Sequence, residues 1–333
     1  MDAGLKRRTG LAVAACAASL LSGCYYGHLV GGQYELLSRR QPIAELLANP
    51  ATDAALRRKL ERTLDARSFA VRELKLPDNG SYTRYADLDR PYAVWNVFAA
   101  PELSLQAHEW CYPMLGCLAY RGYYDPQRAQ AEAQALREQG LETFVAGIPA
   151  YSTLGWFDDP LLSTIGDAED GVAGTIFHEL AHQVEFAGGD TAFNESFATF
   201  VEQEGLRRYL KNAPELAQAA HLRQQRQAAS VGLMLDCRRR LEAIYASDVP
   251  DAEKRERKRA EFERLRREAG AGFAGELNNA SLLPFGLYHA WVPAFAALFR
   301  AEGEDWNAFY QQVGELADLD MEARQRRLEE LNR

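Results

Sequence analysis

The chain has 333 residues, and 47% of them are hydrophobic, which is enough for a packed core in one large domain or two small ones. Its 47 acidic and 38 basic side chains give a formal net charge of −9 at pH 7. This acidic balance argues against binding to nucleic acid, because phosphate backbones are held mainly by Lys and Arg.

The N-terminus has the pattern of a bacterial export signal. Basic residues at positions 6–8 precede an apolar run, residues 11–21, that is too short to span a bilayer. The sequence LSGC at residues 21–24 resembles the lipobox of bacterial lipoproteins, and an ordinary cleaved signal with a chance cysteine is the alternative. We expect a signal peptide over residues 1–23 and a mature chain of net charge about −11, anchored to the membrane through a lipid on Cys24.

The cysteines and the residue after Cys24 indicate the cell envelope. By resemblance to enterobacterial sorting rules, the absence of an aspartate after Cys24 predicts the outer membrane, facing the periplasm. Cys111 and Cys117 flank a turn-like segment, and we expect them to form a disulfide, with two buried thiols as the alternative. Cys237 is then left unpaired.

The mature chain begins with helical spacing and continues with short strands. Apolar residues recur at helical spacing up to Phe69, which predicts a helical N-terminal segment over residues 24–90. Beyond a turn cluster at residues 77–81 the pattern changes to short aromatic and β-branched runs. We expect a helix over residues 127–139 and strands over residues 93–99, 115–124 and 143–148.

The C-terminal half is predicted to be almost wholly helical. Its helices are interrupted at residues 212–214, 247–250 and 270–275, and no internal repeat is apparent. The expected fold is α+β: a zincin-like metallopeptidase core over residues 91–205, and a helical C-terminal subdomain, 206–333, that walls one side of a cleft.

A zinc-site motif, HELAH at residues 178–182, lies in a predicted helix over residues 174–186. His178 and His182 are four residues apart, so both imidazoles lie on one helix face and can reach one tetrahedral Zn²⁺ per chain. Glu179 can take a proton from the attacking water and pass it to the leaving amine, while zinc polarises the scissile carbonyl. Such a motif arises by chance in roughly one chain in a hundred. The apolar neighbours predict a buried helix, which favours zinc over two solvated histidines.

A catalytic zinc needs a third protein ligand. Residues 190–202 are predicted to form a second helix packed on the first, and two glycines at 188–189 allow the chain to reverse between them. Glu195 lies near the N-terminus of this helix, where the helix field favours an ionised carboxylate, and is the expected third ligand. Asp190, the predicted N-cap, is the alternative. Glu202 can orient a ligand, but a solvated helix position is the preferred interpretation.

The motif and its surroundings resemble known zinc peptidases. HELAHQ followed by NESFATFVE resembles the gluzincins, especially the membrane alanyl aminopeptidases, although only twelve residues separate His182 from Glu195 here. The chain is more similar to a bacterial family of predicted aminopeptidases, lipoprotein-like chains that share the zinc helix, the NExFA segment and YSTLGWFDDP, which stands at residues 151–160. Further matches at residues 117–123 and 278–280 extend the resemblance over most of the mature chain. It implies a zinc aminopeptidase that acts on peptides.

An aminopeptidase must recognise a free terminal ammonium, normally through a carboxylate. Asp158 and Asp159 are candidate anchors, and Tyr151 and Ser152 are candidate substrate contacts, because their segment can act as the edge strand with which a peptide pairs. An ordinary turn explains the two aspartates equally well. Tyr288 is the candidate hydroxyl for the oxyanion, as a downstream Tyr or His is in many gluzincins, and a packed aromatic is the alternative.

The motif and the export signal are compatible with three functions. The preferred hypothesis is a zinc-dependent peptidase, an aminopeptidase, with Glu179 as general base. The second is a zinc endopeptidase of the cell envelope, and the third is a non-catalytic zinc-containing lipoprotein that binds envelope partners. Retention of the complete motif at residues 178–182 disfavours the third.

Overall fold

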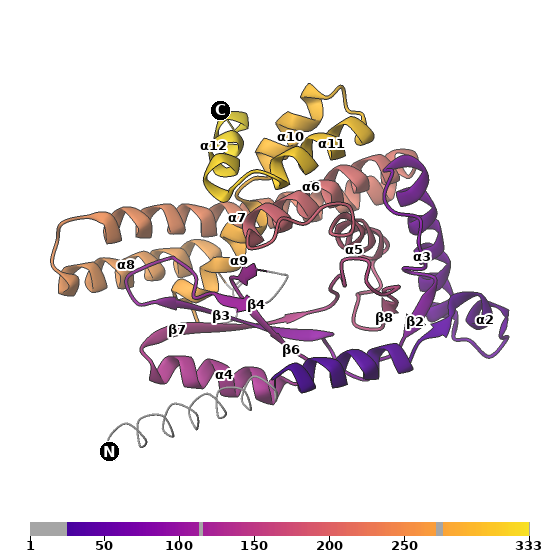
Figure 1. The fold of residues 1–333 in the computed structure, drawn as a ribbon, viewed down its shortest axis with the longest axis horizontal. Coiled ribbons are helices and arrows are strands. Elements are labelled where there is room, and N and C mark those ends of the chain that lie inside the picture. The colour runs from indigo at the N-terminus through magenta and orange to yellow at the C-terminus, as the bar shows by residue number, and fades with distance from the viewer. Residues whose placement is uncertain (1–24, 113–115, 271–275, 333) are drawn as a thin grey trace, which may run out of the picture.

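The computed structural model describes residues 25–112, 116–270 and 276–332 (Figure 1). It shows a mixed α+β fold whose C-terminal half is largely helical, which confirms the predicted fold class. A helix over residues 25–38 is followed by β1 (Gln41–Pro42), α2 (Ile43–Ala48), α3 (Ala54–Glu73) and β2 (Arg84–Ala86). The two short strands form a small sheet with β8 (Leu161–Leu162), in the order β1-β2-β8.

The main sheet has the order β6-β3-β7 and is antiparallel throughout. Its central strand β3 (Val94–Pro101) pairs along its whole length with β7 (Leu141–Ile148) and, over three residues, with β6 (Arg121–Tyr123). The predicted strand 115–124 is two short strands instead, β5 (Gly116–Leu118) and β6, because β5 pairs with β4 (Trp110–Tyr112) and β6 with the main sheet.

Helices cover both faces of the main sheet. The side chains of β3 alternate: Val97 and Ala99 pack with α4 (Pro126–Glu138) and with Tyr25 of the first helix, whereas Phe98 and Ala100 pack with α9 (Asn279–His289). The strand is therefore buried on both sides, and α9 is held close to the sheet.

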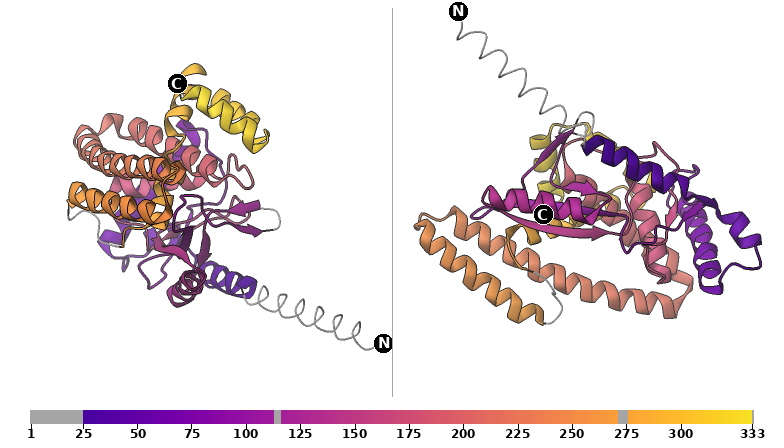
Figure 2. Two further views of the ribbon diagram at one scale, coloured as in Figure 1. Left: turned by 90° about the vertical axis from the view of Figure 1, so that its left-hand side faces the viewer. Right: turned by 90° about the horizontal axis from the view of Figure 1, so that it is seen from below.

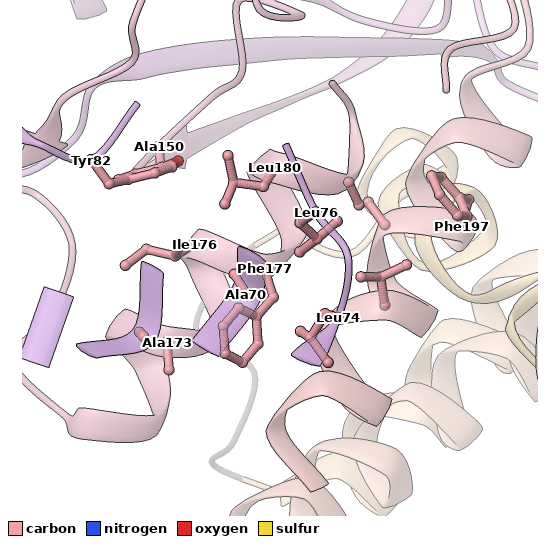
Figure 3. Close-up of a cluster of buried hydrophobic side chains, with 14 of the residues drawn as sticks. Ala70, Leu74, Leu76, Tyr82, Ala150, Ala173, Ile176, Phe177, Leu180 and Phe197 are labelled. Carbon is pink, nitrogen blue, oxygen red and sulfur yellow. The ribbon is translucent and has the colours of Figure 1, made fainter. Parts of the chain in front are cut away.

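The helical core is built around α5 (Glu169–Ala181), which packs on α3 and α6 (Thr191–Tyr209). Figure 3 shows Ile176 and Phe177 of α5 among buried side chains that include Leu74 and Leu76. On α6, a Cβ at Gly205 would stand 2.8 Å from Phe177 Cδ2, so this glycine permits the close approach of the two helices.

The predicted motif helix, residues 174–186, is shifted in the structure. It begins five residues earlier and ends at Ala181, with His182 as its C-cap. Beyond this point the backbone amides bond three residues back, as Val184 does to Ala181, and the chain turns toward α6. The apolar pattern alone did not show that the helix ends at Ala181, because the first glycine, Gly188, comes seven residues later.

The remaining helices form the C-terminal half. After a 3₁₀ turn at Leu210–Asn212, α7 (Pro214–Ala246) and α8 (Asp251–Ala269) run side by side as an arm (Figures 1 and 2). The stretch Asn279–Ala301 has the length and hydropathy of a membrane span, but it is divided between α9 and α10 (Val292–Ala301), which join the core clusters. Two more helices complete the chain, α11 (Trp306–Ala317) and α12 (Met321–Leu331).

Candidate metal centre

Three ligand side chains from α5 and α6 converge on one point. The imidazoles of His178 and His182 lie one helical turn apart, with ring centroids separated by 5.0 Å. Oε2 of Glu195 lies 3.4 Å from Nε2 of His178 and 3.7 Å from Nε2 of His182. One ligand atom from each residue lies within 4.8 Å of the others, so the group can hold a metal ion.

The polar atoms of this group fit a cation. Oε2 of Glu195 and Nδ1 of His182 are buried and make no hydrogen bond to any described residue. A buried carboxylate oxygen without a donor is costly, and a cation held between Glu195 and the two imidazoles removes that cost. Two nitrogens and one carboxylate oxygen are the donors of a catalytic zinc site that keeps an open position.

The structure assigns another role to Asp190, the alternative third ligand. Its Oδ1 accepts a hydrogen bond of 3.0 Å from the backbone N–H of Phe193 and so caps α6. Its Oδ2 forms an ion pair of 2.9 Å with Arg324 of α12, and both side chains are 6% exposed. Both oxygens are thus engaged, and Glu195 remains the third member of the group.

The buried ion pair predicts a large effect on stability. Arg324→Ala should lower the free energy of unfolding by about 3–5 kcal/mol, because it leaves the Asp190 carboxylate buried and unpaired. Arg326→Ala, on the same helix but in an exposed pair with Glu322, should cost less than about 1 kcal/mol. Urea unfolding of both variants checks this, and equal costs would contradict it.

The metal group lies in the wall of a pocket of about 570 Å³. Glu179 also lines this pocket, is buried, and follows His178 directly. Burial raises the pKa of Glu179 to about 7, a value suited to a general base near neutral pH. Other lining residues come from β3, β7, α9 and the first helix, among them Val94, Ile148 and Leu29.

Residues 24–328 match the model of a family described as "Putative aminopeptidase". The chain belongs to this family. No curated protein and no solved structure matches it. The match covers the HExxH helix, the Glu195 helix and the pocket, so the recognised resemblance is confirmed at the level of the aminopeptidase family.

In this aminopeptidase-family chain, a second carboxylate orients the first histidine. Nδ1 of His178 lies 3.2 Å from Oε2 of Glu202, about two turns along α6 from Glu195. The Glu202 side chain is 36% exposed, so it is partly solvated as the sequence favours, but it also contacts the histidine, which is the orienting role that the sequence left as the less favoured interpretation. A carboxylate on the far ring nitrogen fixes the tautomer of a metal-binding histidine and raises its basicity.

Glu202→Gln is expected to weaken metal binding by about 10–100-fold, because it removes this orienting charge. Glu204→Gln, on the same helix, should leave the affinity unchanged, since Glu204 pairs with Arg207 and Arg208 instead. Competition against a chromogenic chelator measures both affinities. Equal losses in the two variants would show that Glu202 has no specific role.

The protonation of the metal-free site sets how metal binding depends on pH. Burial alone would lower the pKa of His178, but its contacts with Glu195 and Glu202 outweigh burial and raise the pKa well above the ordinary value. The metal-free imidazole is therefore protonated at neutral pH, and a metal must displace that proton. Affinity should fall about tenfold for each unit by which the pH is lowered. Calorimetry in buffers of different ionisation enthalpy should show about one proton released per ion; no release would contradict this.

Tyr288 lies in the pocket. Its ring stacks on His178, with centroids 6.1 Å apart and planes 20° apart, and burial raises the pKa of its phenol well above the ordinary value. The C-terminal part of α9 is held by α6, since Ser196 Oγ donates to the carbonyl of Leu287. The structure thus places the ring of Tyr288 beside His178 of the metal group.

The four candidate substrate-binding residues of the 151–160 segment, two contacts and two ammonium anchors, fall into two pairs. Tyr151 and Ser152 line the pocket. Asp159 is buried and accepts hydrogen bonds from the backbone and hydroxyl of Thr153 and from Gln183, the residue after the metal helix. Asp158 accepts one from the backbone of Gly80. Both carboxylates thus hold the segment in place, and neither is among the residues that line the pocket.

Sequence reasoning missed Tyr120, which lies between β5 and β6. It lines the pocket, and burial together with the Glu195 carboxylate raises the pKa of its phenol. A second phenol therefore lies near the metal group, and its ring packs against the cluster that contains Ala280 and Leu283 of α9. It lies in a segment matched by the resemblance, residues 117–123, but nothing in that segment's composition singles it out.

Cys111 and Cys117 form a disulfide across the β4–β5 hairpin, whose tip at residues 113–115 lies outside the described part of the chain. The hairpin contacts the reversal between α5 and α6: a Cβ at Gly116 would stand 2.7 Å from the backbone N of Gly189. The disulfide therefore braces the loop that brings Glu195 to the histidines. Cys24, the predicted lipid attachment site, also lies outside the described residues.

Proposed function

We propose that this chain is a zinc-dependent peptidase of one zinc per chain, and within that class an aminopeptidase with a zincin-like core over residues 91–205. The observation that carries the proposal is the convergence of His178, His182 and Glu195 beside Glu179 in one pocket. A zinc ion held there would act as a Lewis acid on the scissile carbonyl. It would also lower the pKa of the attacking water, so that the water gives up its proton more readily.

The chain's own residues supply the proton transfers and the charge stabilisation. Glu179, as a carboxylate, accepts the proton of the attacking water and returns it to the leaving amine nitrogen. The phenol of Tyr288 donates a hydrogen bond to the oxygen on which negative charge develops. The pocket is lined mainly by apolar and aromatic side chains, which favours a peptide with an apolar residue at the cleaved bond.

Family membership supports exopeptidase action, whereas one observation favours an endopeptidase as a second candidate. Among the described residues that line the pocket, the carboxylates are those of Glu179 and Glu195, and both are committed to the hydrolytic site. An ammonium anchor normally requires a further carboxylate. Cleavage within a chain needs no such group.

The decisive experiment compares initial rates on amino-acid anilides with rates on N-blocked, internally quenched peptides, for wild type and Glu179→Gln. An aminopeptidase cleaves the free anilides faster, and blocking the amine abolishes cleavage. Faster cleavage of blocked peptides would replace the aminopeptidase proposal by the endopeptidase one. A zinc-loaded protein that cleaves neither substrate would be a non-catalytic lipoprotein.

We also propose that the mature chain is anchored by a lipid on Cys24 in the outer membrane, facing the periplasm. The support is the signal pattern over residues 1–23 and the lipobox that ends it. Labelling with radioactive palmitate should mark the wild-type chain and fail to mark Cys24→Ala. Equal labelling of the two would overturn the anchor.

A further inference from the structure

The helix over residues 25–38 presents an exposed face that is apolar and uncharged. Tyr26, Val30 and Tyr34 are spaced four residues apart, so they lie on one side of the helix, and they are 44%, 69% and 73% exposed. The glycines between them, Gly27 and Gly31, also face open space. No residue from 25 to 34 carries a formal charge. A solvated helix face ordinarily carries charged side chains, so this one indicates contact with something apolar.

The opposite face of the same helix forms part of the pocket wall. Tyr25 and Leu29 line the pocket, and the Tyr25 hydroxyl donates to the carbonyl of Gly122 over 3.0 Å. The Tyr124 backbone N–H donates to Nε2 of His28 over 3.0 Å. The helix is therefore fixed to the catalytic body, and its exposed face is the outside of the pocket wall.

A second exposed apolar element adjoins this helix. Trp156 and Phe157 are 64% and 45% exposed, and Leu154 of the same loop lines the pocket. The loop is tied to the first helix and its end at two points: the Tyr151 hydroxyl donates to Gln33, and Arg40 donates to the carbonyl of Asp158 over 3.1 Å. Two exposed aromatic side chains thus lie in a loop that also contributes Leu154 to the pocket lining.

The chain that precedes the helix identifies the apolar partner as a bilayer. The predicted lipidated Cys24, the first residue of the expected mature chain, immediately precedes Tyr25. Two residues of chain reach at most about 7 Å, so Tyr26 lies at the membrane surface if Cys24 carries the anchor. Tyr and Trp are the side chains favoured at the level of the lipid headgroups. The helix face has no basic residues, so the contact does not depend on anionic lipid.

We propose that the helix of residues 25–38 lies in the bilayer interface, with Tyr26, Val30 and Tyr34 toward the lipid and Trp156 and Phe157 beside it. The pocket then opens at the membrane surface. The inference about substrates rests on the proposed peptidase function. The substrates of the enzyme are then polypeptides held at the membrane surface, such as the emerging ends of membrane-bound proteins, rather than freely dissolved peptides.

A fluorescent label on the helix face tests the docking directly. The lipidated chain with Val30→Cys, labelled with an environment-sensitive fluorophore, is reconstituted in phosphatidylcholine vesicles that contain a quencher lipid. Labelling is selective because Cys24 carries the lipid, Cys111 and Cys117 are paired and Cys237 is buried. The control is Leu222→Cys on α7, which is also exposed.

The label at position 30 should shift to the blue and be quenched several-fold more than the label at position 222. Similar quenching at the two positions would overturn the proposal. So would quenching that requires anionic lipid, or a spectral shift that depends on protein concentration without vesicles, which indicates a second copy of the chain on this face. None of these readings depends on peptidase activity.

A double variant then tests the consequence for substrates. Tyr26→Ser with Tyr34→Ser should leave hydrolysis of a soluble substrate unchanged, because both side chains point away from the pocket. Hydrolysis of the same peptide tethered to the vesicle by a lipid should fall several-fold. Equal rates for variant and wild type on the tethered peptide would overturn the link to substrate, and absence of hydrolysis by wild type would instead refute the peptidase function.

Discussion

Replacing Glu179 with glutamine should reduce peptide hydrolysis by at least about 10²–10⁴-fold, the usual contribution of a general base. The substitution keeps the size of the side chain but removes its ability to take a proton. Glu179 is not one of the three converging ligands, so the metal content should stay at that of wild type. Initial rates and elemental analysis of the same sample measure both quantities.

The matched control for this variant is Glu185→Gln. Glu185 lies four residues beyond the end of α5. Its carboxylate accepts a hydrogen bond from the backbone N–H of Phe186 and lies near Gly314, and Glu185 is not among the residues that line the pocket. The activity of the Glu185→Gln variant should equal that of wild type. If Glu179→Gln retained near-normal rates with metal bound, Glu179 would not be the base, and the proposed mechanism would fail.

Loss of a metal ligand is expected to have the other large effect. Glu195→Gln removes the only carboxylate oxygen that lies between the two imidazoles, among the described residues, and leaves a two-nitrogen site. Removing an outer-shell partner already costs about 10–100-fold in metal affinity, and loss of a direct ligand should cost more. Zinc content after dialysis should fall close to zero, and hydrolysis should fall with it.

The thermal stability of this variant provides an independent reading. A ligand that binds only the folded chain stabilises it by about 2.7 kcal/mol at a hundred times its dissociation constant, so zinc should raise the melting temperature of wild type. It should not raise that of Glu195→Gln at the same concentration. His221→Ala, an exposed histidine of α7, should behave as wild type. A full equivalent of zinc in Glu195→Gln would show that the third ligand is another group.

The metal group could be predicted from the sequence because its geometry is local. His178 and His182 share a helix face by spacing alone, and Glu195 follows within a short reversal that two glycines permit. The buried strands β3 and β7 and the helix α4 were also predictable, since each has a clear period and clear ends. Their observed bounds differ from the expected ones by one or two residues.

The rest of the site depends on contacts between residues far apart in the chain. Glu202 has the sequence surroundings of a solvated residue, and only the packing of α6 on α5 brings it to His178. Tyr120 lines the pocket from the connection between β5 and β6, and Tyr25 lines it from the first helix. Their spacing in the sequence gives no sign of this. Asp159 carries the carboxylate that a substrate anchor requires, but its two oxygens accept hydrogen bonds from Thr153 and Gln183.

The zinc-peptidase function is best tested by the rate of peptide hydrolysis during removal and return of zinc. Purified wild type should contain about one zinc per chain, lose hydrolysis when a chelator removes that zinc, and regain it when one equivalent is restored. Glu195→Gln, treated in parallel, should regain nothing. Hydrolysis that persists after complete removal of the metal, or zinc-loaded protein that cleaves no peptide, would show that the His178, His182 and Glu195 group is not the centre of a zinc peptidase.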